Sequence, residues 1–224
     1  IDLIKKQLNG KIPLIGFIGS PWTVATYLIE GNSTKTFKKV LRILKEDELF
    51  LERLLEQITT LSIDYLQKQV AHGVDITMIF DTWGSLLNEN EYERFSLKYI
   101  RKIKEALILN DVPLIYYSRG LGDKLNYVEN LNVDVLGIDS TANIKVVKEK
   151  LGKKFSIQGN LDVDVLKKDE NIIFQEIEKI LSGFGPGSGH IFNLGTGITP
   201  DIDPTKVKLL IDILRDISPK YHIE

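Results

Sequence analysis

Short apolar runs alternate along this chain with longer stretches whose apolar residues recur at helical spacing. The runs are four to six residues long and lie at residues 13–18, 76–80, 113–117, 134–138, 155–158 and 190–194. Apolar runs of this length are typical of strands that are buried on both faces. The pattern therefore predicts six strands.

The stretches between these runs predict helices at residues 46–71, 89–109, 121–131, 143–150, 170–182 and 203–217, and another directly after Gly19–Ser20–Pro21. In the longest stretch, apolar residues recur three and four positions apart, as at Leu51, Leu55 and Ile58. Asp203 followed by Pro204 is a helix start signal. Strands that alternate with helices indicate a parallel sheet with helices outside it.

Six strands leave two architectures open. One is an open doubly wound sheet, and the other is a (β/α)8 barrel whose first two βα units lie outside this chain. A closed barrel needs eight strands and about 250 residues, whereas this chain has 224 residues and only twelve precede the first strand. Periodicity does not choose between them, but both are α/β folds. In either case we expect a single domain over residues 1–224.

Composition excludes several classes of protein and site. The net charge of −2 creates no field that would recruit nucleic acid or an anionic membrane. The chain has no cysteine, which excludes disulfides, thiolate nucleophiles and cysteine-ligated metals, and fits a reducing compartment. No apolar run approaches the roughly 18 residues of a membrane helix, and no signal peptide is recognisable. We therefore expect a soluble, cytoplasmic protein, with a plastid or another organelle as the alternative location.

Three predicted strands end in motifs that are typical of ligand sites. Gly19–Ser20–Pro21 follows the first strand, and the segments IFDTWGS (79–85) and FNLGTGITP (192–200) include the ends of two others. The carboxyl ends of parallel strands meet at one edge of a sheet, where α/β folds bind ligands. Three such strand ends favour an enzyme over a binding module.

The motifs PLIGFIGSPWTVATYLIEG, IFDTWGS, IDST, IQGNLD and FNLGTGITPDIDP occur in this order from about Pro13 to the C-terminal helix. Together they closely resemble the uroporphyrinogen decarboxylase family. The resemblance implies a distorted (β/α)8 barrel, here incomplete with about six βα units. It implies cofactor-free removal of carbon dioxide from the four acetate side chains of uroporphyrinogen III, which gives coproporphyrinogen III in haem biosynthesis. It also implies a homodimer.

Two motifs of the family do not occur in this chain: an arginine-rich RQAGRY-like segment and an aspartate in an FSDI-like context. The resemblance thus covers the C-terminal two-thirds of the family. It implies that the catalytic aspartate lies outside this chain, which contains no catalytic residue of its own. We expect the 224-residue chain to be inactive by itself.

The resemblance assigns substrate binding to Tyr27, Phe80, Thr82 and Thr196. The hydroxyls of Tyr27 and Thr82 would contact substrate carboxylates, and Phe80 would form an apolar wall beside the macrocycle. Thr196 stands where the family usually has histidine, and threonine has less reach and is never cationic. Without the resemblance, Tyr27 would be interpreted as a buried aromatic residue with a satisfied hydroxyl. Strand alternation turns Asp81 to the opposite face, where we interpret it as structural, with a cap of the following turn as one role.

Two other functions stay open. An inactive remnant of the same fold would explain Thr196 and the absent motifs. A corrinoid-dependent methyltransferase is less favoured, because its zinc site needs cysteine. We expect no metal site, since no two histidines share a metal-ligand spacing, and the resemblance implies that no organic cofactor is needed. Arg119 after the third strand is either a basic group near an anionic substrate or a solvated loop residue.

Overall fold

The computed structural model describes residues 1–32, 34, 36–107, 111–120, 122 and 124–221. The chain divides into two compact units. The first comprises residues 1–119 and 126–134, and the second comprises residues 120–125 and 135–224. Each unit contains three parallel strands.

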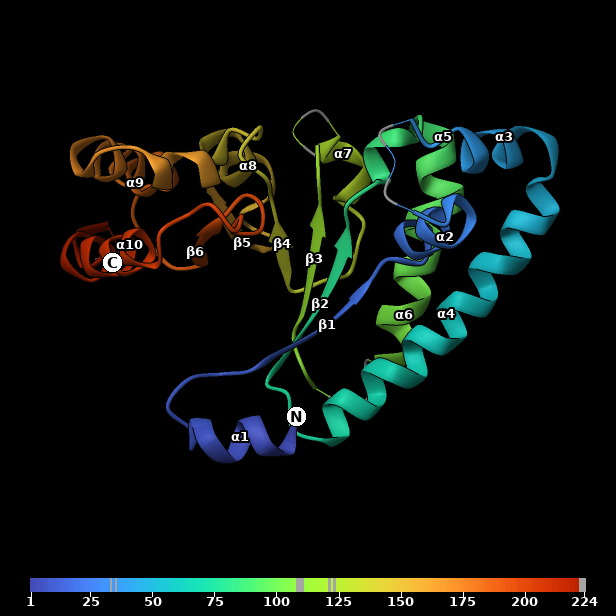
Figure 1. Cartoon of the computed structure of the whole chain (residues 1–224), viewed down its shortest axis with the longest axis horizontal. Coiled ribbons are helices and arrows are strands. Elements are labelled where there is room, and N and C mark those ends of the chain that lie inside the picture. Colours follow the sequence, from blue (N-terminus) through green and yellow to red (C-terminus); the bar gives the residue numbers. More distant parts are fainter. Residues whose placement is uncertain (33, 35, 108–110, 121, 123, 222–224) are drawn as a thin grey trace. The chain divides into compact units, whose positions relative to one another are not determined.

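The strands of the first unit are β1 (Ile15–Gly19), β2 (Ile76–Asp81) and β3 (Leu114–Ser118), in that order and all parallel (Figure 1). Their register places Gly19 opposite Phe80, and Phe80 opposite Tyr117. The strands form because their apolar residues are buried against helices on one face, as Ile79 and Tyr116 are.

Helices α2 (Pro21–Glu30), α4 (Glu48–Ala71) and α6 (Lys98–Leu107) lie together on one side of these strands (Figure 1). The side chain of Ser20 accepts a hydrogen bond from the Thr23 backbone N–H, and Pro21 occupies the first turn, so α2 begins directly after β1. The α4 helix matches the predicted stretch 46–71. Its apolar face packs against α2 and α6.

The helical segment that ends in α6 contains one wide turn. It starts as α5 (Glu89–Tyr92), continues as the π-helical turn η2 (Glu93–Leu97), and then becomes α6. Phe95, Ser96 and Leu97 are consecutive and all buried. Three consecutive residues of an α-helix spread over about 200° of its surface, so this part of the segment is enclosed by other elements on more than one side.

Two helices of this unit were not predicted: α1 (Asp2–Leu8) and α3 (Lys38–Glu46). The α1 helix buries no side chain and is held by the ion pair between Lys5 and Asp75, 2.8 Å apart. The α3 helix has no side-chain cap of its own. Its first N–H groups donate to the carboxylate of Glu30.

The second unit contains the parallel strands β4 (Val135–Gly137), β5 (Ser156–Leu161) and β6 (His190–Leu194). Its helices are α8 (Ile144–Leu151), α9 (Glu170–Phe184) and α10 (Pro204–Ile217), with α9 packed against both others. Short 3-10 turns follow β5 and α10: η4 (Val163–Lys167) and η5 (Ser218–Tyr221). Asp203 accepts from the Thr205 N–H at 2.8 Å, which confirms the predicted start of α10.

The structure confirms the six predicted strands, with bounds shifted by up to three residues. The predicted helix 121–131 is wrong over most of its length, because only α7 (Leu125–Val128) is helical. Leu131 N bonds to the Val128 carbonyl three residues back, and this tight turn ends the helix. Residues 121 and 123, and residues 108–109 of another predicted helix, lie outside the described residues.

Candidate functional site

Within the first unit, the loops after β1 and β2 are joined by hydrogen bonds. The backbone N–H of Ser20 donates to the Phe80 carbonyl at 2.8 Å, and the indole N–H of Trp22 donates to the Trp83 carbonyl at 2.8 Å. The motifs around Gly19–Ser20–Pro21 and Asp81–Thr82–Trp83 therefore lie side by side, as the sequence predicts for parallel strand ends.

Tyr27 lies on α2 and is 46% exposed. Its ring meets the ring of Trp83 edge to face, with centroids 6.4 Å apart. Its hydroxyl makes no hydrogen bond within the described part of the chain. The interpretation of Tyr27 as a buried aromatic residue with a satisfied hydroxyl is therefore wrong, and its hydroxyl is available to a ligand.

Phe80 belongs to a row of three aromatic rings that crosses the first three strands. Its ring centroid lies 5.7 Å from that of Phe17 on β1 and 5.7 Å from that of Tyr117 on β3. Sequence reasoning missed Phe17 and Tyr117, although each is an aromatic residue near the end of a predicted strand. The row gives the unit a continuous aromatic surface on one face of its strands.

Thr82 follows β2 directly and is half-buried. Like Tyr27, it makes no side-chain hydrogen bond to the residues that the structure describes. It lies in the turn that begins one residue after the end of β2 and two residues after Phe80. Tyr27 thus offers a hydroxyl from α2, and Thr82 offers one from the loop after β2.

Trp83 lies between several of these residues. Besides Tyr27 it contacts Phe37, with ring centroids 4.5 Å apart, and the guanidinium carbon of Arg119 lies 6.0 Å from its ring centre. Its own indole N–H is buried and finds no acceptor among the described residues. Arg119 is exposed, so the aromatic cluster has a solvated cation beside it, which agrees with both interpretations of this arginine.

Asp81 lies on the opposite face of β2 from Phe80, and it is fully buried. Its carboxylate accepts hydrogen bonds from the hydroxyls of Ser20, Thr23, Ser96 and Tyr116. The expected structural position is thus confirmed. A cap of the following turn is not what the structure shows, because the partners are hydroxyl groups of other elements. The next turn is the 3-10 turn η1 (Gly84–Leu86).

Thr196 belongs to the second unit, at the bend that follows β6. It is half-buried, and its hydroxyl forms no hydrogen bond with the described residues. The preceding Gly195 is required for packing, since a Cβ there would lie 2.4 Å from the backbone nitrogen of Ser140. Packing alone therefore explains the glycine before Thr196, without a bound ligand.

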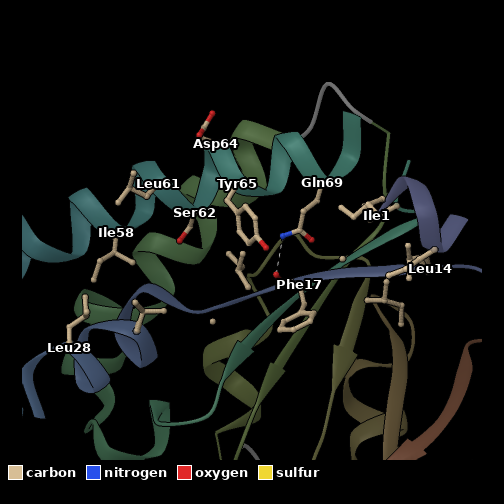
Figure 2. Close-up of a pocket in the computed structure, with 17 residues that line it drawn as sticks. Ile1, Leu14, Phe17, Leu28, Ile58, Leu61, Ser62, Asp64, Tyr65 and Gln69 are labelled. Carbon is tan, nitrogen blue, oxygen red and sulfur yellow. Dashed lines mark hydrogen bonds between the residues drawn. The ribbon is translucent and has the colours of Figure 1, made fainter. Parts of the chain in front are cut away.

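An apolar groove of about 860 Å³ lies along β1, beneath α4 (Figure 2). Its lining includes Phe17, Leu61 and Tyr65, and the amide of Gln69 reaches across it to the Phe17 carbonyl at 3.1 Å. Tyr27, Phe80 and Thr82 do not line it. Among the described strands, β1 pairs only with β2, so this groove follows the free edge of β1.

Within the described ranges, no three His, Asp or Glu side chains are grouped as a metal ion would need. In the same residues, no helix has both the length and the apolar character needed to cross a membrane.

Comparison with known proteins decides the family. The model of the uroporphyrinogen decarboxylase (URO-D) family matches residues 1–217. The chain belongs to this family. Curated uroporphyrinogen decarboxylases that it matches include those of Ruthia magnifica, at 42% identity over 98% of this chain, and Methylococcus capsulatus, at 41% over 99%. The chain spans 65% and 64% of the length of these two relatives, just under two thirds.

The solved structures also bear on the fold. A methyltransferase from Methanosarcina mazei aligns with a TM-score of 0.81 over 96% of this chain and 62% of its own, at 22% identity. At that identity the likeness concerns the fold alone. With the parallel strands and alternating helices, it confirms an α/β fold of partial TIM-barrel type. Of the two architectures left open by periodicity, the incomplete barrel is therefore the one found in this member of the uroporphyrinogen decarboxylase family.

Proposed function

We propose that the protein to which this chain belongs is a uroporphyrinogen decarboxylase, a carboxy-lyase of porphyrin biosynthesis that acts on uroporphyrinogen III without a metal or organic cofactor. The observation that carries this proposal is the family match over residues 1–217. Curated relatives at 40–42% identity that bear this name support it.

The proposed reaction needs an electron sink for the bond that releases carbon dioxide. Protonation of the pyrrole next to the acetate supplies one, because the cationic ring accepts the electron pair. The protein must then stabilise the cation with a carboxylate, hold the other carboxylates of the substrate, and exclude water. Binding groups for carboxylates and a flat apolar surface are therefore the features to look for in this chain.

The first unit offers such features. The hydroxyls of Tyr27 and Thr82 have no partner in the described chain, and each would donate to a substrate carboxylate. Phe80, within its row of aromatic rings, would form the apolar wall beside the macrocycle. Asp81 is unsuited to stabilise the cation, because it is buried and faces away from these groups. This agrees with a catalytic aspartate outside this chain.

The proposal is tested with the complete protein. Incubated with uroporphyrinogen III in the absence of oxygen, it should release four molecules of carbon dioxide and yield coproporphyrinogen, which is detected as the oxidised porphyrin by chromatography. Failure of the complete protein, in an assay where the Methylococcus capsulatus relative is active, would favour the inactive remnant instead. We further infer a cytoplasmic homodimer. Light scattering of the same protein tests the dimer, and fractionation of the cells that make it tests the location.

The 224-residue chain alone should show no useful turnover. Loss of one preorganised electrostatic group commonly reduces the rate by about 10²–10³, and the arginine motif is absent as well. Turnover by the chain alone would show that the catalytic group lies within these residues, contrary to this proposal.

Thr196 is tested by replacing it with the residue that the family usually has. In the complete protein, Thr196→His should bind the substrate more tightly, because imidazole reaches further and can carry a positive charge. Thr196→Val is the matched control and should bind no more tightly than the original. Weaker binding by Thr196→His would show that this loop does not meet the substrate in the way that its counterpart in the family does.

A further inference from the structure

Asp81 is a buried carboxylate whose partners are all neutral hydroxyl groups. Its Oδ1 accepts from Ser20 at 2.7 Å and from Thr23 at 3.2 Å, and its Oδ2 accepts from Ser96 at 2.6 Å and from Tyr116 at 2.8 Å. None of the described lysines, arginines or histidines forms an ion pair with it. A buried charge is costly unless hydrogen bonds compensate it, so this carboxylate depends on all four.

Two of the four hydroxyls also accept hydrogen bonds from backbone N–H groups. The Ser20 oxygen accepts from the Thr23 N–H at 3.0 Å, and the Thr23 oxygen accepts from the Trp83 N–H at 3.3 Å. A hydroxyl has a single proton to donate. Ser20 and Thr23 each donate that one proton to Asp81. Their oxygens are therefore oriented to accept from these two backbone N–H groups.

These contacts lead directly to the two candidate substrate-binding residues. Trp83 is fixed at its backbone N–H by Thr23 and at its carbonyl by Trp22, so the adjacent Thr82 is fixed as well. The Trp83 ring supports the ring of Tyr27, which lies four residues after Thr23 on the same face of α2. Asp81 is thus linked to Tyr27 and to Thr82 through Thr23 and Trp83.

The other side of the carboxylate is held rigidly. Burial and the charge of Asp81 raise the pKa of Tyr116 and of Tyr92, so both phenols remain protonated. The hydroxyl of Tyr92 lies 2.6 Å from that of Tyr116. At Gly84, a Cβ would lie 2.6 Å from Asp81 Oδ2. Only glycine therefore fits at position 84 beside the carboxylate.

The fourth donor, Ser96, lies in the wide turn η2. Wide turns of this kind recur at functional sites. Here the turn directs a buried hydroxyl of the helical segment toward the strand end. The four donors therefore come from the loop before α2, from α2 itself, from η2 and from β3, and Asp81 joins these elements.

We propose that Asp81 is the positioning residue of this site, which fixes the spacing between the Tyr27 and Thr82 hydroxyls. Asp81 touches no substrate, because it is buried on the opposite face of β2. A carboxylate suits this role because it accepts four hydrogen bonds and donates none. The positioning is independent of the ligand. Its effect on binding rests on the proposed function.

The first experiment measures the position of Trp83 without any ligand. Trp22 is fully buried, so quenching of tryptophan fluorescence by acrylamide reports on Trp83. Asp81→Asn should increase the quenching constant and weaken the near-ultraviolet circular dichroism, because an amide presents its N–H groups to two of the four hydroxyls. Thr23→Val should also increase the quenching constant and weaken the circular dichroism. Thr23→Ser keeps a hydroxyl at this position, so both signals should stay as in the original protein.

The matched control is Thr77→Val. Thr77 is a buried residue of the same strand, and its hydroxyl bonds to the Pro113 carbonyl at 3.1 Å, at the opposite end from Asp81. This variant should lower the melting temperature without changing the Trp83 signals. If Asp81→Asn and Thr23→Val also change only the melting temperature, Asp81 is merely structural and the proposal fails. If Asp81→Asn does not fold, the Thr23→Val and Thr23→Ser pair decides.

The second experiment titrates the complete protein with oxidised uroporphyrin III as a fluorescent probe. Asp81→Asn and Thr23→Val should raise the dissociation constant about 10-fold, whereas Thr23→Ser and Thr77→Val should leave it near the original value. Unchanged binding in both Asp81→Asn and Thr23→Val would overturn the proposal. If the unmodified protein neither binds uroporphyrin nor decarboxylates uroporphyrinogen III, the proposed function fails, and the Trp83 signals alone decide the positioning role.

Discussion

The indole N–H of Trp22 donates a hydrogen bond of 2.8 Å to the carbonyl oxygen of Trp83, 61 residues further along the chain. Trp22 is fully buried at the start of α2, whereas Trp83 is half-buried in the loop after β2. One side chain thus fixes the backbone of a second strand end, and this contact is open to a direct test.

Trp22→Phe removes this bond while keeping an aromatic ring in the core. The free energy of unfolding should fall by about 1–3 kcal/mol, because the Trp83 carbonyl loses its donor and the smaller ring packs less well. Urea unfolding followed by circular dichroism measures the change. Tyr65→Phe, at an exposed position of α4, is the control and should stay within about 0.5 kcal/mol of the original. Equal stability of the two variants would contradict this account of the contact.

Tyr27→Phe and Thr82→Ala should weaken ligand binding without altering stability. Neither hydroxyl bonds to the described residues, so folding loses no internal hydrogen bond in either variant. Each variant should lose the roughly 0.5–1.5 kcal/mol of one hydrogen bond to the ligand, and more if a carboxylate is left unpaired. Uroporphyrin titration and thermal melting of the complete protein measure the two quantities. A clear drop in melting temperature with unchanged affinity would exclude both residues from the site.

The free edge of β1 should make the 224-residue chain associate with itself. Ile15 and Phe17 are 41% and 60% exposed there, and apolar edge strands pair with other chains. Phe17→Lys should reduce association, because a charge on an edge strand opposes such pairing. Ile172→Lys, at a 40% exposed position of α9, is the control and should change little. The measurement is sedimentation velocity, and a monodisperse unmodified chain that melts cooperatively would contradict the prediction.

Asp201 should titrate at an unusually low pH. The hydrogen bond from Lys167, 2.8 Å away, and a second from Thr199 lower the pKa of Asp201 to about 2. A lowered carboxyl pKa contributes stability that is present above the ordinary value of 3.8 and is lost as the pH falls through 2. Carbon-13 NMR of the carboxyl group measures this pKa. Lys167→Met should return it toward 3.8, whereas Lys179→Met should not; an Asp201 pKa near 3.8 in the original chain would refute the pairing.

The strands and long helices were predictable because their signal is local. The spacing of Leu51, Leu55 and Ile58 is sufficient to predict α4, and Asp203 with Pro204 fixes the start of α10. The α3 helix was missed because its cap is the carboxylate of Glu30, which belongs to a different helix. Local sequence carries no sign of such a cap.

The site shows the same division between local and tertiary information. Motifs led to Tyr27, Phe80 and Thr82, but the aromatic row depends on the strand register that brings Phe17 and Tyr117 beside Phe80. Register is set by how strands pair, and an apolar run does not specify it. The partners of Asp81 could not be predicted either, since they come from three separate segments of the chain, around residues 20–23, 96 and 116.

The wide turn η2 makes the length of this helical segment informative. Each residue of an α-helix turns the chain by about 100°, so deleting one residue from the regular part of this segment would rotate one side of it against the other. The wide turn holds about one residue more than a regular turn, so a deletion between Glu93 and Leu97 would leave a regular turn and keep the directions of α5 and α6. What such a deletion removes is one of the turn's side-chain positions, from which Ser96 now donates to Asp81. In sequence alignments of this family, a one-residue gap at this point therefore marks the loss of a position within the turn, whereas a gap in α6 marks a change of side-chain direction.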